Sequence, residues 1–102
     1  MALQVSILAK ATGAGNTSDF EVSREPVTVA IYPEANIGTD TAILHKKNPD
    51  GTYDSVYKDG AEVELSASEP AVVIYGGGVY RLEFTGRTAA IGAYIESTTP
   101  VA

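Results

Sequence analysis

Apolar side chains recur at every second position along most of this chain. The period is clear where Val63, Leu65 and Ala67 alternate with polar residues. Alternation of this kind places the apolar side chains on one face of a β-strand. No segment repeats its apolar residues at helical spacing, and glycine or proline interrupts the pattern about every 8–12 residues. The sequence therefore predicts a chain of short strands.

Nine segments are expected to form these strands. They cover residues 3–9, 20–24, 27–31, 42–47, 52–58, 63–67, 71–75, 80–84 and 89–95. The run at 71–75, AVVIY, is continuously apolar, which is typical of a central strand covered on both faces. Residues 10–18 and 34–40 are rich in glycine, asparagine and small polar side chains, so they are expected to be loops.

Two short motifs predict hairpin turns. Asn48-Pro49-Asp50-Gly51 places proline where a type I turn needs its fixed φ and glycine where a positive φ returns the chain to the ladder. The pair Asp59-Gly60 is the strongest two-residue hairpin signal in the chain. These turns favour antiparallel pairing.

The length of 102 residues suits one domain, residues 1–102, with termini at 1–2 and 97–102 expected to be mobile. Two sheets packed face to face need only one apolar face per strand, and this is what the alternation supplies. We therefore predict an all-β fold, a compact antiparallel β-sandwich of about eight or nine short strands. A small β-barrel is the alternative.

Charge and composition exclude several function classes. Seven basic residues against thirteen acidic ones give a formal charge of −6, which is unfavourable for binding nucleic acid. Without cysteine there is no disulfide or thiolate chemistry. No apolar run approaches the length of a membrane span, and no secretory signal is visible at the start of the sequence.

Residues that could carry catalysis or bind a metal are few. His45 is the only histidine and lacks a nucleophile motif, so we expect it on the sheet surface. Asn48, Asp50, Asp54 and Asp59 could supply oxygen ligands to calcium, but their spacing lacks the regular acidic ladder of a calcium loop. Turn formation explains these residue types equally well. We predict no enzymatic activity, no cofactor and no metal.

Tyrosine is the residue type that points to an interface. The chain has six tyrosines and no tryptophan, and tyrosine is enriched at interfaces because its ring packs while its hydroxyl stays hydrated. Ordinary strand propensity is the competing explanation. The predicted interface residues are Leu3, Val5, Ile7, Tyr32, Tyr53, Tyr57, Tyr80 and Tyr94. The strand Leu3–Ala9 and the tail Thr98–Ala102 are candidate arms that a partner's sheet could accept.

The chain resembles small structural proteins of tailed bacteriophage virions over about two thirds of its length. The resemblance rests on the segments Val29-Ala30-Ile31-Tyr32-Pro33, Thr41 to Lys47 (TAILHKK), Asp50-Gly51-Thr52-Tyr53, Gly78-Val79-Tyr80-Arg81-Leu82 and the closing strand Ile91 to Ile95. In that group a strand ending in a turn like Asp50-Gly51-Thr52-Tyr53 precedes a strand like Gly78-Val79-Tyr80-Arg81-Leu82. A closing apolar strand then follows, here Ile91 to Ile95.

The resemblance implies a capsid decoration (cement) protein, or a head-fibre or tail-fibre component, folded as a β-sandwich. Such a protein is made in the host cytoplasm and sits on the outer capsid surface of the virion. It assembles as a homo-oligomer, with a trimer favoured, and its partners are the major capsid protein or other virion subunits. The alternative function is a carbohydrate-binding or receptor-binding module of a phage fibre.

Overall fold

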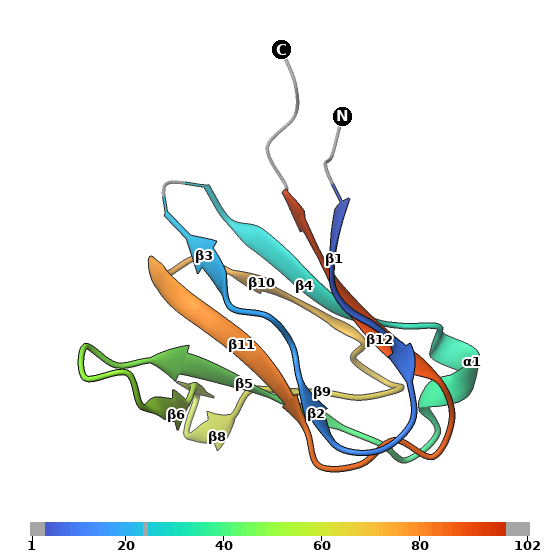
Figure 1. Cartoon of the computed structure of the whole chain (residues 1–102). Helices are drawn as coiled ribbons and strands as arrows, with labels where there is room; N and C mark the ends of the chain where they lie inside the picture. Colours follow the sequence, from blue (N-terminus) through green and yellow to red (C-terminus); the bar gives the residue numbers. More distant parts are fainter. Residues whose placement is uncertain (1–3, 24, 98–102) are drawn as a thin grey trace.

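The computed structural model describes residues 4–23 and 25–97, and most of these residues lie in β-strands (Figure 1). The elements in the described residues are β1 (Gln4–Ala11), β2 (Gly15–Asn16), β3 (Phe20–Val22), β4 (Val27–Tyr32), α1 (Glu34–Ile37), β5 (Ala42–Lys47), β6 (Tyr53–Ser55), β7 (Tyr57–Lys58), β8 (Ala61–Glu62), β9 (Glu64–Leu65), β10 (Ala71–Ile74), β11 (Gly78–Phe84) and β12 (Ile91–Ser97). No helix in the described ranges is long and apolar enough to cross a membrane.

Two antiparallel sheets form the sandwich, and β7 and β8 form a separate two-stranded sheet. The first has the strand order β1-β12-β4-β10. In the second, β11 and β5 pair at the centre, β2 and β3 both pair with β11, and β6 and β9 both pair with β5. Figure 1 shows the two sheets as separate layers. The predicted antiparallel β-sandwich is confirmed.

The core lies between the facing surfaces of the two sheets. Strand alternation explains it: on β11, Tyr80, Leu82 and Phe84 are buried while Arg81 and Glu83 are only partly covered. The buried hydrophobic residues are Ile7, Phe20, Val22, Val29, Ala30, Ile31, Ile37, Ala42, Leu44, Leu65, Ile74, Tyr80, Leu82, Phe84, Ile91 and Ala93. Each large member contributes about 1.5–3 kcal/mol through burial.

Both predicted hairpin turns are present. Gly51 has a φ of +91° and donates its N–H to the carbonyl of Asn48 at 3.0 Å, closing the turn between β5 and β6. Between β7 and β8, Asp59 and Gly60 have φ values of +53° and +82°. Two consecutive positive φ values are typical of a type I′ turn, which matches the twist of paired strands.

The second hairpin leaves the sheet at a well-defined point. The Val56 N–H donates to Leu44 O at 2.9 Å, the Leu44 N–H donates to Val63 O at 3.0 Å, and the Val63 N–H donates to Val56 O at 2.8 Å. The segment predicted as one strand, 52–58, is therefore broken at Val56 into β6 and β7. The β7–β8 hairpin projects from this point.

Residues 10–18 and 34–40 differ from the loops that their composition predicted. β1 continues to Ala11, and Gly15–Asn16 form β2. Residues 34–37 form the single turn α1, which ends at Gly38 with a φ of +56°. Ile37 is fully buried by this turn, so the burial of one side chain stabilises a helix too short to form alone.

β1 is an edge strand with an irregular register. The pairing of β1 with β12 shifts between Ser6 and Leu8 and again between Leu8 and Ala11. Ile7 is buried, whereas Val5 and Ala9 are exposed, so the predicted inward face of this strand is wrong at these two positions. Residues 4–9 are hydrogen-bonded members of the sheet and not a free arm. The predicted tail arm, 98–102, lies outside the described residues.

β10 is the opposite edge of the same sheet, which corrects the prediction of a central strand for residues 71–75. In the described chain β10 pairs with β4 alone. Val72 and Ile74 face the core side, while Val73 and Tyr75 are exposed. Apolar residues thus occupy both faces of this strand, although only one of the two faces is covered.

Candidate interaction surface

The structure places the predicted interface residues in several different parts of the molecule. Ile7 and Tyr80 belong to the core, so they are not surface contacts. Tyr80 packs against Phe20, with ring centroids 6.1 Å apart, and donates its hydroxyl proton to Gly76 O at 2.7 Å. Leu3 lies outside the described residues. Five predicted residues therefore remain at the surface, namely Val5, Tyr32, Tyr53, Tyr57 and Tyr94.

An apolar groove runs beside β10 on the open side of the sandwich. We call it the β10 groove. Its volume is ≈ 280 Å³, and it is lined by Leu44, Val56, Tyr57, Lys58, Val63, Val72, Val73, Ile74, Tyr75, Gly76 and Tyr80. One wall is β10, and the other is the base of the β7–β8 hairpin. The hydrogen bonds that join Val56 and Val63 to Leu44 attach this hairpin base to β5.

The exposed large hydrophobic residues concentrate at this groove. In the described residues there are four: Val5, Tyr57, Val73 and Tyr75. The last three line the β10 groove, with exposed fractions of 66%, 37% and 76%. Single exposed apolar residues are ordinary, but a contiguous group marks an interaction site.

The free backbone edge of β10 borders the same groove. Ile31 N–H donates to Pro70 O at 2.9 Å, and Ala71 is opposite Ala30 in the next pair. Antiparallel ladders alternate between hydrogen-bonded and non-hydrogen-bonded pairs, so Val72 and Ile74 bond to β4. The N–H and C=O groups of Ala71 and Val73 consequently point away from β4. These are unpaired groups that another strand could use.

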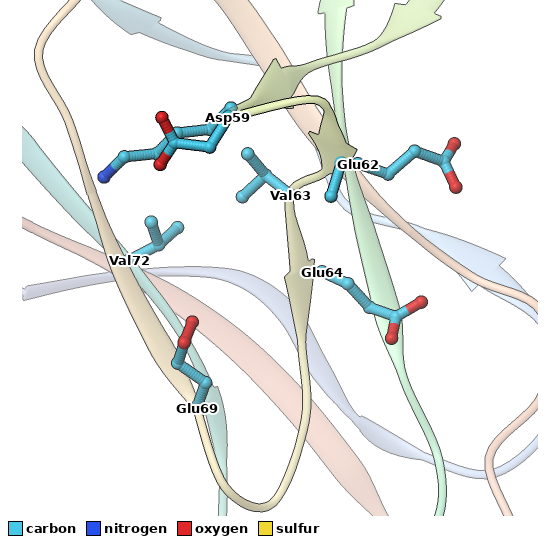
Figure 2. A pocket seen from close by; sticks show the side chains of 8 residues that line it. Asp59, Glu62, Val63, Glu64, Glu69 and Val72 are labelled. Atoms are coloured by element: carbon cyan, nitrogen blue, oxygen red, sulfur yellow. The ribbon is translucent and has the colours of Figure 1, made fainter.

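A second hollow extends the groove toward an acidic end. It has a volume of ≈ 310 Å³ and shares Lys58, Val63 and Val72 with the β10 groove. Its remaining lining residues are Asp59, Ala61, Glu62, Glu64 and Glu69. Figure 2 shows Val63 and Val72 on the two sides of the hollow, with Asp59 and Glu69 at its ends. Glu62 and Glu64 extend from the far side of the strand in this view.

Tyr53 lies on the outer face of the sheet that contains β5 and β11. Charged side chains contact both its ring and its hydroxyl. The hydroxyl donates to the carboxylate of Asp19, 2.8 Å from both oxygens, and this hydrogen bond raises the pKa of Tyr53 above 10.0. The guanidinium carbon of Arg81 lies 3.6 Å from the ring centroid, and Lys47 Nζ is 3.6 Å from Asp19. The ring and hydroxyl of Tyr53 therefore contact side chains of this chain on the sheet surface.

Tyr32 and Tyr94 meet on the outer face of the four-stranded sheet. Their ring centroids are 5.5 Å apart in an edge-to-face arrangement. Gln4 and Ser6 complete a shallow depression of ≈ 380 Å³ around them. The depression is lined by no charged residue, unlike the acidic end of the β10 groove.

The residues weighed as catalytic or metal-binding serve turns and surface pairs. His45 Nε2 lies 3.7 Å from Glu83 Oε1. The Asp50 carboxylate accepts from the N–H of Thr52 at 3.0 Å and from its hydroxyl at 2.7 Å, and these bonds lower the pKa of Asp50 below 3.8. Asn48 Nδ2 donates to Asp54 at 2.9 Å. No group of three or more metal-ligating side chains occurs in the part of the chain that the structure describes.

Val73 and Tyr75 are exposed residues that the sequence analysis did not select. Their apolar character suggested a buried location, because a continuous run such as AVVIY is typical of a covered strand. One signal was available: Pro70 precedes this run and three glycines follow it. Proline within or beside a strand favours an edge position.

Comparison with known proteins identifies a shared fold. No protein-family model matches the chain, and no curated protein matches it by sequence. Among solved structures, the crystal structure of the SPBc2 prophage-derived protein YomS is similar, with a TM-score of 0.70 and 12% sequence identity. The match covers 95% of this chain and 92% of the other. The β-sandwich described here is thus the fold of a prophage-derived protein of nearly the same extent.

Proposed function

We propose that this chain is a non-enzymatic structural protein of a bacteriophage particle that works by binding other protein subunits. In its specific form, the proposal is a capsid decoration protein on the outer surface of the virion that bridges neighbouring capsid subunits. The observation that carries it is the group of exposed apolar residues Tyr57, Val73 and Tyr75 beside the unpaired edge of β10. Such a surface suits binding to protein.

The similarity to a prophage-derived protein supports a phage setting for this fold. The sequence resemblance to virion structural proteins points in the same direction. It includes Gly78 to Leu82, which lie in β11 at the centre of the second sheet. Its tyrosine, Tyr80, is a core residue that also contributes to the lining of the β10 groove.

A decoration protein stabilises a shell by adding contacts that must break before the shell opens. Each contact can be weak, because many copies act together and the effective concentration of each within the lattice is high. The β10 groove is small, so one copy would bind weakly on its own. Repetition over the shell supplies the strength.

Self-association is part of the proposal, with a trimer favoured. We assign it to the outer face of the four-stranded sheet around Tyr32 and Tyr94. The depression itself is lined by no charged residue, and the Glu96 carboxylate beside it accepts a hydrogen bond from Gln4 at 3.1 Å. Self-association at this face leaves the β10 groove free for a different protein.

Two measurements on the phage that encodes the chain test the proposal. Mass spectrometry of purified particles should detect the chain at a constant copy number relative to the major capsid protein. Re-addition of the purified protein to particles lacking it should raise the temperature at which they release DNA. Absence of the chain from purified particles would refute the proposal.

The depression at Tyr32 and Tyr94 also supports the alternative of a carbohydrate-binding or receptor-binding module of a phage fibre. An aromatic ring beside the amide of Gln4 and the hydroxyl of Ser6 is a combination suited to a sugar. A glycan-array screen separates the two functions. Binding that is lost in Tyr94→Ala would favour the fibre module, and an oligomer lost in the same variant would favour self-association.

A further inference from the structure

We propose that the β10 groove accepts an extended, basic segment of a different protein subunit, which adds as a strand to the free edge of β10. The inference rests on the proposed function and names the partner of its site. Strand addition combines backbone hydrogen bonds, which give affinity, with pockets for alternate side chains, which give specificity. The described surface offers both.

The backbone part of the site is the outward edge of β10. Ala71 and Val73 present their N–H and C=O groups away from β4, as the register of β10 against β4 requires. In the described chain no strand pairs with this edge. An added strand would satisfy these groups and extend the sheet to five strands. The β10 groove would contact only one face of this added strand.

The side-chain part of the site is the apolar floor next to that edge. Val56, Val63 and Val72 line it, and Tyr57 and Tyr75 stand exposed at its border. In an added strand, alternate side chains point to the same side. One set would therefore rest on this floor, so the segment must be apolar at every second position.

Charge selects the remaining positions. The acidic end of the groove contains four acidic residues, Asp59, Glu62, Glu64 and Glu69, against one basic residue, Lys58. Asp59 and Glu69 flank the hollow, whereas the carboxylates of Glu62 and Glu64 point away from it and add negative charge beside it (Figure 2). Figure 2 shows Glu69 on the β10 side of the hollow and Asp59 at the turn of the hairpin. A segment with lysine or arginine between its apolar residues complements this charge, and an acidic one is repelled.

The charge also favours a different protein over a second copy. A second copy carries the same formal charge of −6 and would set like charges against the acidic end of the groove. Residues 1–3 and 98–102 contain no lysine or arginine, so these two segments do not match the charge of the groove. A basic segment of another subunit meets both requirements.

The test uses a soluble peptide of alternating valine and lysine, with a matched peptide in which glutamate replaces lysine. Isothermal titration calorimetry with the full chain should show binding of the lysine peptide and at least about tenfold weaker binding of the glutamate peptide. Equal binding of the two peptides, or no binding of the lysine peptide, would overturn the proposal.

Two pairs of variants locate the binding. Val73→Pro removes an N–H from the free edge without removing a hydrogen bond to β4, and Val73→Thr keeps that N–H. The proline variant should bind the lysine peptide about three- to tenfold more weakly than the threonine variant. Glu69→Lys should weaken binding, whereas Glu34→Lys, on α1 and outside the groove, should not. Circular dichroism confirms that each variant is folded.

The same variants distinguish this inference from the proposed function. If Val73→Pro and Glu69→Lys associate with phage particles as the unaltered chain does, strand addition is wrong while the structural role stands. If the chain is absent from particles but binds the lysine peptide in the predicted order, the groove stands and the virion role is wrong. A homodimer that Val73→Pro abolishes would show that a second copy occupies the edge, and would overturn the inference.

Discussion

Thr17 and Leu82 exchange two hydrogen bonds inside the sandwich. The N–H of Thr17 donates to Leu82 O at 3.0 Å, and the N–H of Leu82 donates to the hydroxyl oxygen of Thr17 at 2.9 Å. Thr17 is buried, so its hydroxyl replaces water as the acceptor for the backbone of β11. The pair fastens the segment between β2 and β3 to the centre of the second sheet.

Replacing this hydroxyl with a methyl group should destabilise the fold. In Thr17→Val the Leu82 N–H loses its acceptor in a buried place, which costs about 1–3 kcal/mol. Chemical denaturation followed by circular dichroism measures the change in the free energy of unfolding. The control is Thr39→Val, because Thr39 is exposed. Equal stability of Thr17→Val and Thr39→Val would contradict the assigned role.

Gly92 allows β1 to approach β12 closely. A Cβ atom at this position would lie 2.8 Å from Leu8 O and 3.1 Å from Lys10 N, both backbone atoms. Gly92→Ala should therefore displace β1 and cost about 1–3 kcal/mol through overpacking. At Gly86 an added Cβ meets nothing within 4 Å, so Gly86→Ala is the matched control. Thermal unfolding of the two variants should differ, and identical midpoints would show that β1 is not held as described.

Arg87 is a buried cation that serves backbone carbonyls. Its Nε donates to Gly13 O and one terminal nitrogen donates to Ile91 O, each at 2.8 Å. Arg87→Met keeps much of the side-chain volume but leaves both carbonyls without these donors, so we expect a loss of about 2–4 kcal/mol. Lys10→Met, at an exposed position, should change stability by less than about 0.5 kcal/mol. Denaturant titration of both variants provides the comparison.

The bond between Tyr53 and Asp19 predicts a pH dependence at the alkaline end. Because the hydroxyl donates to a carboxylate, the pKa of Tyr53 in the folded chain lies above 10.0, its ordinary value. A group whose folded pKa is raised stabilises the fold at pH values below its unfolded pKa. This contribution is then lost as the pH rises through the folded pKa.

Ultraviolet absorbance of phenolate measures this ionisation. Subtracting the titration of Tyr53→Phe from that of the unaltered chain should leave a transition above pH 10.0. In Asp19→Asn the same difference should move to lower pH, since the acceptor is no longer charged. A difference transition centred at or below pH 10.0 in the unaltered chain would show that the bond does not form in solution.

Much of the fold could be predicted from the sequence because side-chain alternation and turn chemistry are local properties. These local properties predict the Asp59-Gly60 hairpin and the turn ending at Gly51. They also predict that Leu82 and Phe84 of β11 point inward. The helix α1 could not be predicted, because its four residues are stabilised by the burial of Ile37 in the hydrophobic core.

The interaction surface was harder to predict because exposure depends on strand order. The pattern AVVIY is the same whether its strand is central or at an edge, and only the pairing of β10 with β4 alone decides the case. Tyr80 and Tyr57 are the same residue type on strands, yet one is in the core and the other is at the rim of the groove. Alternation assigns residues to a face, but it does not say whether that face is covered.

Hydrogen exchange in the chain bound to phage particles tests the central claim most directly. The amides of Ala71 and Val73 point outward from the β10 edge, so they should exchange quickly in the free chain. Binding through strand addition predicts that both amides become strongly protected on the particle. A particle-bound chain in which these two amides exchange as fast as in the free chain would contradict the account.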